Sequence, residues 1–272
     1  LLARVYPNGA ADVNQFQAAG GPGWLIRELL GAGLLHGDVP TVAGEGLAAY
    51  CREPWLEEGR LAWRDLPEQS PAEDIVRPAA APFAQESGLQ LLSGNLGRAM
   101  VKTSAVDPAY WQVRAPVRVF DSEAAVHQAY AAGLLQGDLV LVVRFQGPRA
   151  NGMPELHKLM PLLVNLQRNG QKVALLTDGR LSGASGQVLA ALHLTPEAAA
   201  GGVLARVQEG DWINVDALSG RLELEVSEAE LATRQPVRLP EELAAGFGLG
   251  LFATQRRLVG PADQGATTLE WE

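Results

Sequence analysis

The chain has 272 residues, of which 47% are hydrophobic and 19% charged, and its formal net charge is −9. A mean hydropathy of +0.01 fits an ordinary globular protein with enough apolar surface for a substantial core, and the acidic balance argues against nucleic acid or an anionic membrane as a partner. The single cysteine excludes an intramolecular disulfide framework, and no apolar run approaches the roughly 20 residues of a membrane-spanning helix.

The first third of the chain predicts helices followed by a loop. Residues 13–35 have helical spacing, with Asp12 as the cap of the first segment and a break at Gly-Gly-Pro-Gly 20–23. A short helix is expected over residues 41–50. Residues 52–88 combine several prolines and acidic residues with weak periodicity, so we interpret them as mostly loop or linker.

The rest of the chain, after a domain boundary near residues 80–90, predicts a strand-rich α/β domain. Short apolar segments bounded by Gly, Asn or Pro are typical of strands, and continuous apolar runs are typical of strands buried on both faces. The predicted strands are 89–93, 99–104, 117–120, 139–145, 172–177, 203–207, 212–215 and 221–226.

Three helices are predicted between and after these strands. Residues 123–132 follow a cap at Asp121 or Ser122, residues 154–169 open with Pro154 at a first helical position, and residues 228–234 follow a serine cap. The strand–helix–strand pattern around residues 154–169 has the length of a right-handed parallel crossover.

Two polar, glycine-rich loops follow the parallel strands of this crossover. They are 146–155 (QGPRANGMPE) and 177–186 (TDGRLSGASG), and ligands of α/β proteins favour this end of the strands. Glu155 fits either a carboxylate placed against a helix dipole or an oxygen ligand of Mg²⁺. Ser182 fits either a turn serine or a catalytic serine whose pKa is depressed by a metal or a helix N-terminus.

Four charged residues are candidates for binding substrate. Asp178 and Arg180 either pair with each other or orient the second loop. Arg98 and Lys102, in the segment SGNLGRAMVKTSA, are the best unassigned cations for a phosphate group. Spacing by itself leads no further than an α/β enzyme of uncertain class.

The amino-acid sequences of the two loops indicate a particular family, which the spacing of their residues does not. LLTDGRLSGASG (175–186) and GPRANGMPELHKLMP (147–161) resemble the signatures of the dihydroxyacid/6-phosphogluconate dehydratase family. Segments 194–216, 91–106 and 18–35 extend the resemblance in the same order. The sequences of the two loops are more similar to the 6-phosphogluconate branch of the family than to the branched-chain amino-acid branch.

The resemblance implies a lyase of carbohydrate metabolism. The reaction would be dehydration of 6-phospho-D-gluconate to 2-dehydro-3-deoxy-6-phosphogluconate in the Entner–Doudoroff pathway of gluconate metabolism. In the family an iron–sulfur cluster acts as Lewis acid on the departing 3-hydroxyl, Mg²⁺ binds the carboxylate end of the substrate, and a deprotonated serine takes the C2 proton. Carried over by position, Ser182 is the base and Glu155 is the Mg²⁺ ligand.

The resemblance also implies that this chain holds only part of the active site. The family's cluster cysteines belong to an N-terminal half that the chain lacks, and Cys51 matches none of their motifs. We therefore expect residues 1–80 to be the incomplete end of an N-terminal α/β domain, with the helix face around Trp24 exposed. Residues 81–272 would form a β-barrel-like swivelling domain.

Several expectations about partners follow from the same resemblance. The isolated chain should be inactive, and its partners should be the N-terminal half of the parent enzyme and a small anionic sugar acid. The full-length enzyme should be a cytoplasmic homodimer. Three other interpretations stay open: a dehydratase of another 2,3-dihydroxy acid or aldonate, an inactive stand-alone binding module, and an unrelated α/β protein with chance motifs.

Overall fold

The computed structural model describes residues 1–85, 88–182, 186–241 and 250–269 of the chain. The chain divides into two compact units, Leu1–Ser87 and Gly88–Glu272. Across the described ranges, no helix has both the length and the apolar character needed to cross a membrane.

The first unit begins with two helices, α1 (Val13–Ala18) and α2 (Gly21–Gly31). The predicted cap is confirmed, because the Asp12 carboxylate accepts the backbone N–H of Gln15 at 2.8 Å and the Gln15 side chain accepts the N–H of Asp12 at 2.8 Å. The predicted break is also confirmed. Gly20 between the helices has φ of 109°, a left-handed conformation that only glycine adopts at low cost.

A small core holds these helices in place. Trp24 is only 1% exposed and packs with Ala19, Leu66 and Val76. The expectation that the helix face around Trp24 is exposed is therefore wrong. The segment after residue 65 folds back over α2 and covers the indole ring, a long-range contact that the helical periodicity does not encode.

Two hairpins replace the helix and part of the loop predicted for this unit. The predicted helix over 41–50 is wrong: β1 (Pro40–Thr41) pairs with β2 (Gly44–Glu45), and only the 3₁₀ helix η1 (Ala48–Cys51) follows. Strands β3 (Arg52–Glu57) and β4 (Arg60–Asp65) form an antiparallel hairpin within the predicted loop.

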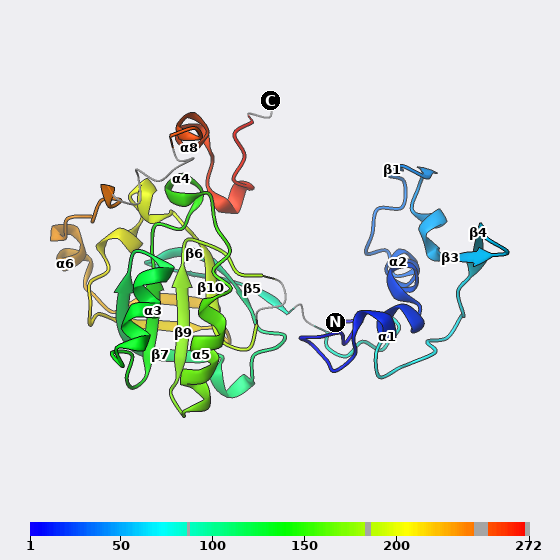
Figure 1. Cartoon of the computed structure of the whole chain (residues 1–272), viewed down its shortest axis with the longest axis horizontal. Coiled ribbons are helices and arrows are strands. Elements are labelled where there is room, and N and C mark those ends of the chain that lie inside the picture. Colours follow the sequence, from blue (N-terminus) through cyan, green and yellow to red (C-terminus); the bar gives the residue numbers. More distant parts are fainter. Residues whose placement is uncertain (86–87, 183–185, 242–249, 270–272) are drawn as a thin grey trace. The chain divides into compact units, whose positions relative to one another are not determined.

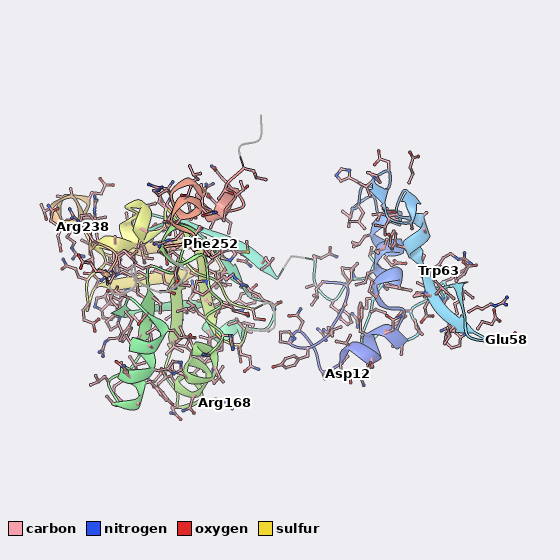
Figure 2. The ribbon with its side chains drawn as sticks, turned by 45° about the horizontal axis from the view of Figure 1, so that its top comes forward. Asp12, Glu58, Trp63, Arg168, Arg238 and Phe252 are labelled. Atoms are coloured by element: carbon pink, nitrogen blue, oxygen red, sulfur yellow. The ribbon has the colours of Figure 1, made fainter. Side chains whose placement is uncertain are left out.

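The β3–β4 hairpin was missed because most of its side chains are exposed on both faces, so it lacks the apolar–polar alternation of a half-buried strand. Cross-strand contacts hold it instead. Arg64 Nε donates to Glu53 at 2.6 Å, and the Arg64 guanidinium lies 3.9 Å from the centroid of the Trp55 ring. Figure 2 labels Trp63 on this hairpin and Glu58 at its turn.

The second unit is a closed eight-stranded β-barrel with the strand order β10-β6-β5-β12-β11-β7-β8-β9. This confirms the α/β fold class with a barrel. The strands are β5 (Leu89–Gly94), β6 (Gly97–Lys102), β7 (Gln112–Phe120), β8 (Leu139–Val143), β9 (Val173–Thr177), β10 (Leu189–Thr195), β11 (Trp212–Asp216) and β12 (Arg221–Leu224). Seven of the eight predicted strands overlap these segments, whereas β10 was not predicted.

The parallel strands β7, β8, β9 and β10 carry the crossover connections. Helix α3 (Glu123–Ala131), capped by Ser122, lies between β7 and β8, and α5 (Leu159–Arg168) lies between β8 and β9. Figure 1 shows both helices against the outside of the barrel. Every residue of β8 and β9 is buried because one face of each strand points into the barrel and the other packs under these helices.

Two further predictions in this unit are wrong. Residues 203–207 form the 3₁₀ helix η4 (Val203–Arg206), since a short buried apolar run does not distinguish strand from helix. The helix predicted to open at Pro154 opens only at Leu159, after the short helix α4 (Pro148–Asn151) and an irregular stretch. The remaining elements are η2 (Pro108–Tyr110), η3 (Ala198–Ala200), α6 (Glu228–Thr233), α8 (Ala253–Leu258) and η5 (Ala262–Gln264).

Candidate functional site at the carboxyl rim of the barrel

The carboxyl ends of β8, β9 and β10 meet at one rim of the barrel. Val143 and Thr177, the last residues of β8 and β9, are partners in the parallel register. Both candidate loops, 146–155 and 177–186, start at this rim, and α4 and α8 lie at the same end in Figure 1. The sheet therefore brings together the two loops that the sequence singles out.

A short backbone bridge joins the two loops. Glu155 and Arg180 are parallel bridge partners, and Leu156 N–H donates to the carbonyl of Arg180 at 3.0 Å. The Arg180 side chain adds a second link, because its Nε donates to the carbonyl of Met153 at 2.8 Å. The loops are thus held at a fixed distance from each other.

Glu155 lies in this bridge and not in a helix. The helix-dipole explanation of its position is therefore wrong, because α5 opens four residues later, at Leu159. Its side chain is half-buried, and no hydrogen bond from any described residue engages its carboxylate. Glu155 is consequently available to an external cation or donor.

Asp178 is buried beneath the rim. Its carboxylate accepts backbone N–H groups from Gln146 at 2.8 Å, Ala198 at 3.0 Å and Phe145 at 3.2 Å. Burial, helped by the charge of Glu197, raises the pKa of Asp178 from 3.8 to about 6 against the opposing effect of the three N–H donors. Asp178 does not pair with Arg180. Its three hydrogen bonds connect the segments that follow β8, β9 and β10.

Ser182 lies half-buried in the second loop, directly before residues 183–185, which are outside the described ranges. Lys102 approaches the end of the same loop. A Cβ on Gly186 would lie 3.5 Å from both Cδ and Cε of Lys102. Burial lowers the pKa of the Lys102 ammonium. One of the two predicted phosphate cations therefore lies beside the loop that carries Ser182.

The other predicted phosphate cation, Arg98, lies at the far end of the same strand. It pairs in register with Thr195 at the end of β10 and forms an ion pair with Asp263. Four residues of extended strand separate it from Lys102, or about 13 Å. The structure does not bring these two cations together, so they do not form a single phosphate site.

Glu197 is a rim residue that the sequence interpretation missed. It is 5% exposed, and its carboxylate accepts the N–H of Arg149 at 2.9 Å and that of Ala150 at 3.3 Å, at the start of α4. Burial raises its pKa. A side chain at Gly147 would collide with the Glu197 carboxylate. No periodicity or spacing in the sequence marks this residue, because the contact spans two separate loops.

The described residues do not by themselves form a metal centre. They contain no group of three or more His, Cys, Asp or Glu side chains arranged to hold an ion. Cys51 belongs to the first unit, where its Sγ lies 3.8 Å from the carbonyl of Leu47 and burial raises the pKa of the thiol. One thiol, and rim carboxylates of which Asp178 and Glu197 already accept backbone N–H groups, fit neither an iron–sulfur cluster nor a complete Mg²⁺ site.

Two family models match the chain. Residues 74–266 match the C-terminal region of the dihydroxy-acid/6-phosphogluconate dehydratases, and residues 1–50 match their N-terminal region. A phosphogluconate dehydratase of Pseudomonas aeruginosa is 57% identical over 97% of the chain, and one of Escherichia coli K12 is 54% identical over 99% of it. A dihydroxy-acid dehydratase of Sulfurisphaera tokodaii is 35% identical over 98% of the chain. The chain spans 44%, 45% and 45% of these relatives, less than half of their length.

Proposed function

The chain belongs to the dihydroxy-acid/6-phosphogluconate dehydratase family, and from that premise we propose that it supplies Ser182 and Glu155 to the active site of a 6-phosphogluconate dehydratase. The observation that carries the proposal is the bridge between Glu155 and Arg180, which holds the two signature loops together at the rim. The greater identity to phosphogluconate dehydratases than to the dihydroxy-acid dehydratase favours the phosphorylated substrate.

The proposed reaction is an elimination of water. The C2–H bond breaks as Ser182 takes the proton, the C2=C3 double bond forms, and the C3–O bond breaks as the hydroxyl leaves. The enol then becomes the 2-keto product, 2-dehydro-3-deoxy-6-phosphogluconate, when a proton returns to C3. Ser182 must be ionised to act as the base, so the site has to stabilise its alkoxide.

The other rim residues have supporting roles in this proposal. Glu155 offers a carboxylate oxygen at the end of the first loop, where it can hold a cation against the substrate's carboxylate. Asp178 acts through the backbone, since its oxygens already accept three N–H groups. Arg180 keeps the loops joined through Met153 and its own carbonyl.

The remaining parts of the site belong to residues outside this chain in the proposal. An iron–sulfur cluster and Mg²⁺ would supply Lewis acidity at the 3-hydroxyl and the carboxylate, as the family resemblance implies. Neither is held by the described donor set alone. The chain by itself should consequently show no dehydration, while the homodimer and the cytoplasmic location stay predictions.

The test is an anaerobic assay on an enzyme that joins this chain to the N-terminal region of its relatives. Ser182→Ala should lower kcat by about 10²–10⁴-fold and abolish exchange of the C2 hydrogen with solvent deuterium, with little change in KM. Ser93→Ala is the matched control, because Ser93 is exposed on β5. Glu155→Gln should raise the Mg²⁺ concentration needed for half-maximal activity.

Three results would contradict the proposal. Activity of Ser182→Ala within a few-fold of the parent would exclude the serine as base. Dehydration of a 2,3-dihydroxy acid or of gluconate in preference to 6-phosphogluconate would instead favour a sibling dehydratase. Activity of the isolated chain would show that the chemistry does not need residues outside it.

A further inference from the structure

An arginine-lined cavity of about 740 Å³ opens at the same rim of the barrel. Its walls include Phe145, which follows β8, and Ala198, which follows β10. The volume lies within the range of about 300–1,000 Å³ that is common for small-molecule sites. The cavity is therefore large enough for a phosphorylated sugar acid.

Four arginines from three segments line this cavity. Arg149 comes from α4, Arg256 and Arg257 come from α8, and Arg238 comes from the segment after α6. No Asp or Glu is among the lining residues that the structure describes. In a chain with a net charge of −9, this local excess of positive charge is a departure from the average surface.

Backbone contacts hold two of these arginines in place. Arg149 Nε donates to the carbonyl of Val259 at 3.3 Å, and Arg256 Nε donates to the carbonyl of Arg149 at 2.7 Å. These bonds connect α4 with the α8 segment across a long stretch of chain. Each uses one N–H of a guanidinium that has five, so further donors are left for a ligand.

None of the four arginines forms an ion pair with a carboxylate of the described residues. Elsewhere in this unit Arg114, Arg144 and Arg234 each form an ion pair, whereas none of the cavity arginines does. Glu197 lies near Arg149 and Arg256, and its negative charge offsets part of theirs. The cavity still has an excess of positive charge, because its described lining contains four guanidinium groups and no carboxylate.

We propose that this cavity binds the phosphate group of a phosphate monoester. Planar guanidinium groups match the oxygens of phosphate through paired, charge-assisted hydrogen bonds, and several arginines suit a dianion better than a single carboxylate. The identity of the monoester, 6-phosphogluconate, rests on the proposed function; the phosphate chemistry rests on the arginines. The cavity and the signature loops share one rim, as a substrate spanning both requires.

This assignment differs from the one that the sequence suggested. Arg98 is already neutralised by Asp263, and Lys102 lies at the opposite end of β6 beside Gly186. Substituting Arg98 or Lys102 therefore distinguishes the phosphate site that the sequence suggested from the arginine-lined cavity.

Isothermal titration calorimetry on the whole 272-residue chain tests the proposal. The probes are 6-phosphogluconate, gluconate and inorganic phosphate at constant ionic strength. Arg257→Gln and Arg256→Gln should each weaken 6-phosphogluconate binding by about tenfold or more, because each removes a charge-assisted contact. Inorganic phosphate should compete, and gluconate should bind far more weakly.

Control variants show whether a loss of binding is specific to the cavity arginines. Arg221→Gln removes the same charge from the exposed start of β12 and should leave binding unchanged. Arg98→Gln and Lys102→Gln test the rival assignment and should change binding less than two-fold. Because Arg256 holds the Arg149 carbonyl, its variant can fail to fold; Arg257→Gln and Arg238→Gln, checked by circular dichroism, then decide.

Three outcomes would overturn the inference: no binding of 6-phosphogluconate to the folded chain, equal binding of gluconate, or an equal loss in Arg221→Gln or Arg98→Gln. The experiments distinguish failure of the phosphate site from failure of the proposed function. Phosphate binding without dehydration in the joined enzyme would contradict only the proposed function. Dehydration that is unchanged after substitution of the arginines would contradict only the phosphate site.

Discussion

Asp178→Asn is the most informative single change in the rim, because it keeps the side-chain size while altering charge and hydrogen bonding. In the wild type, one carboxylate oxygen accepts Gln146 N–H and the other accepts the N–H groups of Phe145 and Ala198. An amide has one acceptor oxygen, so at least one buried N–H group must lose its partner. Leaving a buried donor unsatisfied costs about 1–3 kcal/mol.

The size of the effect should depend on pH. The folded pKa of Asp178 is raised from 3.8 to about 6, so its stabilising contribution is present below pH 3.8 and is lost as the pH rises through 6. At pH 5 the unfolded carboxyl is mostly ionised and the folded one mostly protonated. Raising the pH to 7.5 therefore destabilises the wild type by about 1 kcal/mol, a loss that the Asn variant does not have.

Native-state hydrogen exchange measures both quantities at the three amides concerned. We expect Asp178→Asn to lower the opening free energy of Phe145, Gln146 and Ala198 by about 1–3 kcal/mol at pH 5, and by about 1 kcal/mol less at pH 7.5. Unchanged protection of these amides would show that the carboxylate does not hold the rim. An identical effect at both pH values would refute the raised pKa.

Asp216→Asn is the matched control, because Asp216 also accepts backbone N–H groups, from Leu218 at 2.9 Å and Ser219 at 3.1 Å. Burial there raises the pKa, but hydrogen bonds from Ser219 and Gln112 outweigh it and lower the pKa overall. Its contribution is consequently present above the unfolded pKa and is lost as the pH falls. The pH dependence of this variant should have the opposite sign.

Three further substitutions test what stabilises each unit. Arg234→Gln removes the partner of Asp211, whose side chain is 10% exposed, and should lower the free energy of urea unfolding by about 3 kcal/mol. Arg114→Gln, at a pair whose side chains are 58% and 34% exposed, should have a much smaller effect, and equal effects would argue against burial as the cause. Trp24→Ala should cost about 3–5 kcal/mol and remove exchange protection across residues 1–85. Unchanged protection there would show that Trp24 does not hold this core.

Local chemistry determined most of the elements. Asp12 and Ser122 were identifiable as caps because each side chain bonds an N–H only three residues away. The β8 and β9 segments were identifiable because strands buried on both faces have continuous apolar sequences. The loops 146–155 and 177–186 were identifiable as parts of a functional site from their glycine content, their similarity to the family's signature sequences and their position after these strands.

Long-range contacts decided the rest. The β3–β4 hairpin is stabilised by cross-strand pairs on exposed faces and leaves no periodic signal. The roles of Asp178 and Glu197 depend on backbone groups of other loops, and the arginine cavity gathers residues from α4, α8 and the segment after α6. By itself, the sequence determined the family, seven of the eight barrel strands and the two loops. Only the tertiary structure decided which charges stand together, because barrel closure and not sequence spacing sets the distance between them.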